Sequence, residues 1–238
     1  MAGPAIRVAG PLHGHGRLPE TAQNRAARSA PDLAHGRDPE RTLSGMDASE
    51  LHRRAVAEFA ARVDGIDAVG SGAWTAPTPC TEWNVRALVN HLTYEDKWTT
   101  PMLAGATIAE VGDQFEGDLL GDDPVGAFAT ASREAADAAA LADPGDVVHL
   151  SFGDHPAREY LYQLAADHLI HAWDLAVATD GDRQLDPDVV AGIADWFADR
   201  EAGYRAGGFI GPRVPVSSDD PQDRLLGGFG RDPGWRSR

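Results

Sequence analysis

The stretch Asp167-His168-Leu169-Ile170-His171-Ala172-Trp173-Asp174-Leu175 places acidic and imidazole side chains inside a segment with helical spacing. Residues four apart in a helix lie on one face, with Cβ atoms about 5–6 Å apart. Asp167 and His171 therefore offer two ligand atoms to one divalent metal. A catalytic zinc usually takes about three protein ligands and leaves one position open, so the pair needs a third ligand. His91 is the best candidate.

The spacing alone leaves two interpretations of this stretch open. His168 lies within the apolar stripe of the predicted helix, and Asp167 and His171 lie together on its flank. Polar groups buried without partners cost about 1–3 kcal/mol or more each, so these groups need partners. A hydrogen-bonded aspartate–histidine pair explains the pattern as well as a metal site does. His168 lies three residues from His171 and is therefore the alternate ligand, or a group that orients the ligands.

The composition limits the class of partner and the compartment. The 238-residue chain has a formal net charge of −16, and nucleic acids and anionic membranes instead attract clusters of Lys and Arg, so we expect neither as a partner. The sequence has no apolar run of about 18 residues and no apolar core of a secretory signal near its N-terminus. Cys80 is the single cysteine, which rules out an intramolecular disulfide and favours a cytoplasmic protein. No base lies near Cys80 in the sequence, so we expect a packed thiol rather than a nucleophile.

The chain divides into three parts. Residues 1–45 are rich in Pro, Gly, Arg and His and show no apolar period, which predicts a disordered N-terminal extension. Residues 46–206 contain long segments of helical periodicity, which predict a single metal-binding helical bundle. Residues 207–238 are rich in Gly and Pro, and we expect an irregular C-terminal segment packed on the bundle.

The periodic segments predict four long helices, at about residues 48–69, 82–103, 124–142 and 156–179. Thr81 is the expected N-cap of the second helix. Residues 146–152 alternate enough to suggest one short strand or an extended crossing segment, and a fifth helix is predicted from Asp186-Pro187 to about Gly203. The fold class is therefore all-α, a four-helix bundle with an additional C-terminal helix and an irregular C-terminal tail. Bundles hold metals between facing helices, and the second and fourth helices carry the candidate ligands.

Three motifs resemble those of a known family. The run Pro77-Thr78-Pro79-Cys80-Thr81-Glu82-Trp83-Asn84-Val85-Arg86-Ala87-Leu88-Val89-Asn90-His91 resembles the opening motif of a metal-binding family found in actinobacteria. The run His171-Ala172-Trp173-Asp174-Leu175-Ala176 is similar to its second signature. Its closing signature resembles Asp219-Asp220-Pro221-Gln222-Asp223-Arg224-Leu225-Leu226, followed by Gly230-Arg231-Asp232-Pro233. The family belongs to the DinB-like superfamily, alongside mycothiol-dependent maleylpyruvate isomerase, and the resemblance covers about residues 48–235.

The resemblance implies a DinB-like four-helix bundle that holds a metal through three side chains. The histidine late in the first motif corresponds to His91, and the acid and histidine of the last bundle helix correspond to Asp167 and His171. Aspartate is a tolerated variant at the first of these two positions, and its shorter carboxylate reaches less far. Zinc is the expected ion, although two imidazoles and a carboxylate also suit nickel, manganese or iron.

The resemblance also implies a function. Characterised members of the superfamily use the metal to bind and activate a low-molecular-weight thiol, mycothiol or bacillithiol. A metal lowers the pKa of a bound thiol or water and so supplies a nucleophile at neutral pH. We therefore expect a metal-dependent transferase or isomerase that uses mycothiol on a small electrophilic molecule. The alternative is a non-catalytic metal-binding bundle with a structural or stress-related role, or a role in forming a homodimer.

Overall fold

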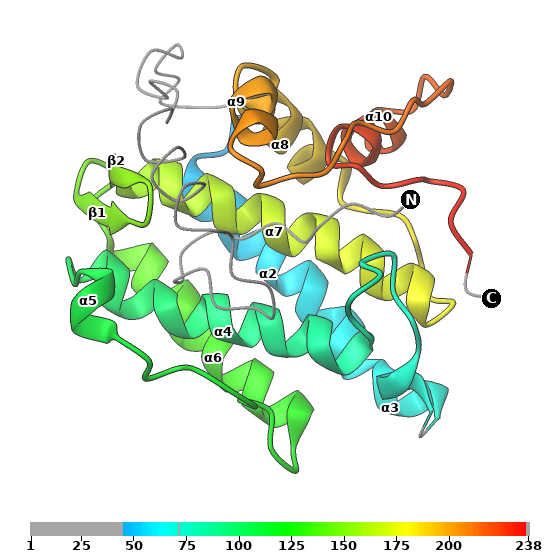
Figure 1. The fold of residues 1–238 in the computed structure, drawn as a ribbon, viewed down its shortest axis with the longest axis horizontal. Helices are drawn as coiled ribbons and strands as arrows, with labels where there is room; N and C mark the ends of the chain where they lie inside the picture. Colours follow the sequence, from blue (N-terminus) through cyan, green and yellow to red (C-terminus); the bar gives the residue numbers. More distant parts are fainter. Residues whose placement is uncertain (1–44, 71, 237–238) are drawn as a thin grey trace.

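Four long helices form the bundle at the centre of the protein (Figure 1). The computed structural model describes residues 45–70 and 72–236, so the extension predicted over residues 1–45 lies outside the described residues except for Gly45. The bundle helices are α2 (Ala48–Asp64), α4 (Val85–Leu103), α6 (Pro124–Leu141) and α7 (Ala157–Ala178). Helices α7 and α6 each pack against both α2 and α4. The predicted all-α four-helix bundle is confirmed.

Side-chain caps determine where three bundle helices begin. Asp47, Asn84 and Asp123 are the N-caps of α2, α4 and α6, and each accepts a hydrogen bond from a backbone N–H in the first turn. The prediction that Thr81 caps the second helix is wrong. The chain still turns at this position, where the Trp83 amide donates to the Cys80 carbonyl over 2.8 Å, so the helix begins only after Asn84.

Helix α7 is surrounded by protein on every side. All of its residues except Arg158 are buried. The bundle helices cover one side of it, and the C-terminal elements α8 (Pro187–Ala198), α9 (Glu201–Ala206) and α10 (Pro221–Gly228) gather along the other (Figure 1). Its polar side chains are therefore removed from water, and each needs a partner within the protein.

Short elements connect the bundle helices. They are α3 (Ile66–Val69), the 3₁₀-helix Ala73–Thr75, α5 (Ile108–Val111), β1 (Val147–Leu150) and β2 (Gly153–Pro156). The sequence predicted one strand here, whereas β1 and β2 form an antiparallel hairpin. Gly153 makes the reversal possible because its φ of 130° is rarely accessible to other residues. Among the described residues, none of the helices combines the length and apolar character that a membrane span requires.

Two predicted helices are interrupted in the structure. The first ends at Asp64, and Gly65 separates α2 from α3. The fifth was predicted to reach Gly203, but the chain turns at Asp199 and Arg200 between α8 and α9. At this turn the Arg200 guanidinium donates to the Glu159 carboxylate of α7 and to the Trp196 carbonyl. A tertiary ion pair therefore overrides the local preference for a continuous helix.

Leu88 and Leu141 allow a matched test of the core. Leu88 is fully buried on α4, whereas Leu141, the last residue of α6, is 88% exposed. Leu88→Ala leaves a cavity, so we expect it to lower the free energy of unfolding by about 2–5 kcal/mol. Leu141→Ala is expected to change that free energy by less than about 0.5 kcal/mol. Urea denaturation followed by circular dichroism measures both, and equal losses would contradict the packing described.

Candidate metal centre

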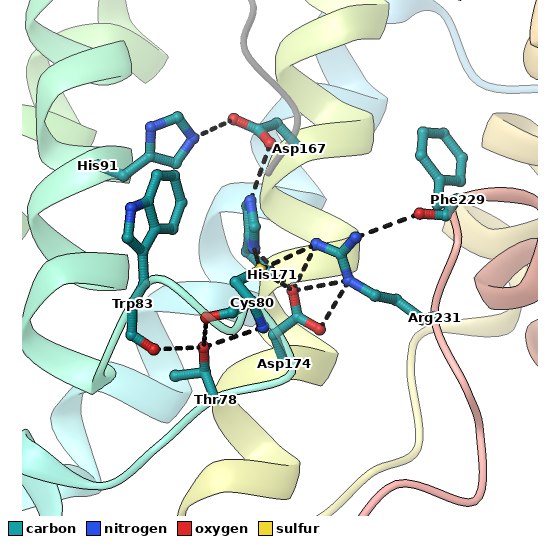
Figure 2. Close-up of polar contacts among 9 residues, drawn as sticks. All are labelled: Thr78, Cys80, Trp83, His91, Asp167, His171, Asp174, Phe229 and Arg231. Carbon is teal, nitrogen blue, oxygen red and sulfur yellow. Dashed lines mark hydrogen bonds and ion pairs between the residues drawn. The ribbon is translucent and has the colours of Figure 1, made fainter. Parts of the chain in front are cut away.

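The bundle brings the three predicted ligand residues together between α4 and α7 (Figure 2). Nε2 of His91 lies 3.0 Å from Oδ2 of Asp167. Nε2 of His171 lies 3.2 Å from the other carboxylate oxygen, Oδ1. The ligand atoms of the three residues all lie within 4.8 Å of one another. The arrangement presents two imidazoles and one carboxylate to a common point.

The electrostatics of the group follow from its burial and its mixed charges. Asp167 and His171 are fully buried, and the His91 side chain is 9% exposed. Burial alone raises the pKa of Asp167, but the adjacent imidazoles of His91 and His171 hold it well below its ordinary value. Burial lowers the pKa of His171, and the carboxylates of Asp167 and Asp174 outweigh this effect and raise it. Asp167 is therefore ionised, as a metal-ligating carboxylate must be.

Trp83 covers the outer side of the group. Its ring centroid lies 4.6 Å from that of His91 and 5.9 Å from that of His171. Trp83 belongs to the turn that precedes α4 and is only partly buried. Its ring therefore restricts the orientation of the His91 imidazole. The side of the group formed by Trp83 and His91 is the one nearest to solvent.

Asp174 orients His171 from the side opposite the candidate metal position. Oδ2 of Asp174 lies 2.8 Å from Nδ1 of His171. When Nδ1 carries the proton and donates it to this carboxylate, Nε2 presents its lone pair toward Asp167. A carboxylate bonded to the second nitrogen is the usual partner of a metal-ligating histidine. The sequence did not indicate this contact, although the i, i+3 relation of Asp174 to His171 was a usable signal.

Arg231 completes this arrangement from the C-terminal segment. Its Nε lies 3.0 Å from Oδ1 of Asp174, and its Nη2 lies 2.9 Å from Oδ2. Arg231 is 1% exposed. Burial raises the pKa of Asp174, but the Arg231 guanidinium outweighs this and lowers it to about 2. Arg231 belongs to the closing motif quoted from the sequence, but the motif did not indicate its partner.

Cys80 lies beside the same ion pair. Its Sγ is 3.1 Å from Nη2 of Arg231, 3.4 Å from Oδ2 of Asp174 and 4.0 Å from Nδ1 of His171. Cys80, His171 and Asp174 are also close enough for a metal. The Arg231 guanidinium, however, already supplies a positive charge to Asp174 and contacts the sulfur. Cys80 is therefore a buried residue that packs against the Arg231–Asp174 pair.

His168, the alternate ligand, is directed toward α2 rather than toward His91. Its ring lies edge-on to those of His52 and Phe59, with centroids 5.8 and 6.1 Å away. Its Nε2 lies 3.3 Å from Oδ1 of Asp96. Burial, together with the neighbouring His168, lowers the pKa of His52 to about 3, so His52 is neutral at pH 7. His168 thus belongs to a second polar group, formed with His52 and Asp96.

Comparison with known families places this geometry in context. A family model described as "Mycothiol maleylpyruvate isomerase N-terminal domain" matches residues 52–176, more than half of the chain. The chain belongs to this family. The match to the mycothiol maleylpyruvate isomerase N-terminal domain covers α4 and α6 and most of α2 and α7, and it includes His91, Asp167 and His171. Arg231 lies outside the matched residues, so the segment that supplies the partner of Asp174 does not belong to the matched domain.

Relatives of known sequence extend the comparison. Two uncharacterized proteins of Mycobacterium tuberculosis, from strains CDC 1551 / Oshkosh and ATCC 25618 / H37Rv, are each 29% identical to this chain over 185 residues. The matched region covers 75% of this chain and 91% of each relative. No solved structure gives a significant match.

The buried pair of Arg231 and Asp174 has a matched surface counterpart in Arg224 and Asp219. Arg231→Met leaves an uncompensated carboxylate in the core, so we expect it to lower the free energy of unfolding by about 3–5 kcal/mol at pH 7. Arg224→Met affects an exposed pair, and we expect little change. The folded pKa of Asp174, about 2, lies below its ordinary value of 3.8. The stabilisation is therefore complete above about pH 4 and is lost as pH falls from about 4 to 2.

Denaturant unfolding of wild type and both variants across pH 7 to 2 measures these differences. The difference in the free energy of unfolding between wild type and Arg231→Met should become smaller as the pH falls from about 4 to 2. An equal loss in both variants at pH 7 would contradict the role of the buried pair. A difference that stays constant down to pH 2 would show that Asp174 is not the group that Arg231 stabilises.

Proposed function

We propose that the protein is a cytoplasmic, divalent-metal-dependent transferase or isomerase that uses mycothiol on a small electrophilic substrate. The observation that carries the proposal is the convergence of ligand atoms from His91, Asp167 and His171. Structural zinc sites usually have four protein ligands, whereas catalytic sites have three and leave a position for an exogenous ligand. The chain presents three at this point, and one of them, His91, is only partly buried, which together favour the catalytic class of site.

The residues fit such a metal. Oδ1 of Asp167 and Nε2 of His171 are buried and, within the described part of the chain, have no hydrogen-bond partner, although only 3.2 Å separates them. Two electron-pair donors this close suit a shared cation. Ligands about 2.0–2.2 Å from a tetrahedral zinc lie roughly 3.3–3.6 Å from one another. The observed separations of 3.0 and 3.2 Å are close to that spacing.

The residues around the ligands orient them and exclude water. Asp174 holds His171 through Nδ1, and Trp83 holds His91 through ring contact. The burial of α7 keeps water from the inner side of the site, whereas Trp83 and His91 are partly exposed, so a thiol would approach from their side. A divalent metal held here would lower the pKa of a bound thiol, so that the thiolate is available at neutral pH.

The family supports the choice of thiol. Its description names mycothiol and an isomerase, and the matched residues include all three proposed ligands. The ligand set suits zinc, and we propose zinc as the resident ion. The substrate belongs to the class of small electrophiles that a thiolate attacks.

A metal-binding bundle without catalysis is the second candidate. The observation in its favour is the complete burial of Asp167 and His171. In that case the ion would fasten α4 to α7, and the protein would not present it to a thiol. The two candidates differ in whether an added thiol reaches the metal.

Cobalt substitution distinguishes the two candidates. We expect untagged protein loaded with Co²⁺ to develop a saturable sulfur-to-cobalt charge-transfer band when mycothiol is added, because the fourth position is open. His171→Ala removes a ligand and should abolish the band. His149→Ala is the matched control, since His149 lies on β1 and pairs with Asp154 outside the site. This variant should keep the band.

The other outcomes are equally informative. Cobalt that binds without a thiol band would favour the non-catalytic bundle. A thiol band that persists in His171→Ala would place the thiol-binding metal elsewhere. Wild-type protein that takes up neither cobalt nor zinc would leave Asp167 and His171 as a buried hydrogen-bonded pair and would overturn the proposal.

A further inference from the structure

A second group of potential ligands lies deeper in the bundle. His52 of α2, Asp96 of α4 and His168 of α7 have 0% exposure. Their ligand atoms lie within 4.8 Å of one another. These residues come from three of the four bundle helices, which surround the centre of the molecule (Figure 1). The group offers the same donors as the first centre, two imidazoles and one carboxylate.

The atoms of this group lack hydrogen-bond partners among the residues that the structure describes. The unpartnered atoms are Nδ1 and Nε2 of His52, Oδ1 and Oδ2 of Asp96, and Nε2 of His168. A buried polar atom without a partner destabilises the folded state. A neutral imidazole carries a lone pair on one nitrogen, so His52 and His168 each offer one lone pair here beside the carboxylate of Asp96, which is the donor set of a cation site.

A shared proton does not account for the group. A proton between Asp96 and His168, whose nearest atoms are 3.3 Å apart, would leave both nitrogens of His52 without partners. The buried carboxylates of Glu159 and Asp174 are paired with arginines. Within the described part of the chain, no arginine or lysine forms an ion pair with Asp96. A cation bound by both Asp96 and His168 would also have His52 within reach.

We propose that His52, Asp96 and His168 bind a second divalent cation of the zinc type. Nδ1 of His168 donates to the Leu164 carbonyl over 2.9 Å, which leaves Nε2 free as a ligand atom, the usual arrangement in metal-ligating histidines. Two imidazoles and a carboxylate suit zinc and its neighbours.

This cation would have a structural role. The first centre takes its ligands from α4 and α7 only, whereas the second would also fasten α2 to these helices. Its ligands are completely buried, so it would be enclosed during folding and would not meet substrate. The second site uses none of the ligands of the first, and the two sites can be tested separately.

Zinc stoichiometry tests the proposal. The full chain, without a histidine tag, is produced in medium containing Zn²⁺, dialysed, and analysed by mass spectrometry for zinc per protein. We expect about two equivalents in wild type and about one in each of His52→Leu, Asp96→Asn and His171→Leu. The double variant His52→Leu with His171→Leu should contain none, and the control His149→Leu should keep two. Circular dichroism establishes that each variant is folded.

The outcomes separate the two sites. One equivalent in wild type that persists in His52→Leu and Asp96→Asn overturns the second site and leaves the first intact. Two equivalents that persist in both variants also overturn it. One equivalent that survives in His171→Leu but disappears in Asp96→Asn supports the second site and contradicts the first. If His52→Leu does not fold, the wild-type stoichiometry and the nearly isosteric Asp96→Asn still decide the question.

Discussion

The complete burial of α7 is the constraint on which the rest of the structure depends. A helix covered on all sides cannot leave its charged side chains to water, so each one requires a partner from another element. The described partners of three of these side chains come from far along the chain, and they are Arg200 for Glu159, His91 for Asp167 and Arg231 for Asp174. The polar residues of one helix thereby determine where α4, the turn after α8 and the segment after α10 must lie.

These buried contacts determine how the helices are positioned relative to one another more than they increase the free energy of unfolding. Removing two charges from water costs about as much as their attraction returns, so a buried ion pair is weak evidence for net stabilisation. The apolar residues that surround α7 supply the main driving force. The ion pairs specify the register at which helices meet, and that register brings the ligand atoms of His91, Asp167 and His171 to one point. The convergence of the candidate ligand atoms is therefore a consequence of how α7 is buried.

The sequence predicts what depends on local periodicity. The four bundle helices follow from apolar spacing, and the i, i+4 relation of Asp167 and His171 follows from helix geometry. The predictions that failed concern caps, tight turns and one position where a nonlocal contact forms. Arg200 interrupts the predicted fifth helix because it pairs with Glu159, which lies 41 residues earlier. The pairing of β1 with β2 likewise depends on the turn at Gly153 rather than on strand periodicity.

At the candidate site, too, the sequence predicts some residues and not others. Helix spacing and the resemblance to known motifs supplied the three proposed ligands, and the structure brings them together. Neither indicated the contacts behind them, because Arg231 lies 57 residues from Asp174. The sequence did not indicate the group of His52, Asp96 and His168, because these residues also lie far apart along the chain. His52 lies on the first helix of the bundle, and no spacing rule connects it to α7.

The central claim is that the bundle holds a divalent metal between α4 and α7 through His91, Asp167 and His171. Anomalous diffraction at the zinc absorption edge, from crystals of the zinc-loaded full chain, tests it most directly. The account predicts an anomalous peak about 2.0–2.2 Å from Nε2 of His91, a carboxylate oxygen of Asp167 and Nε2 of His171. Crystals that contain bound zinc but show no peak at this point would contradict the account.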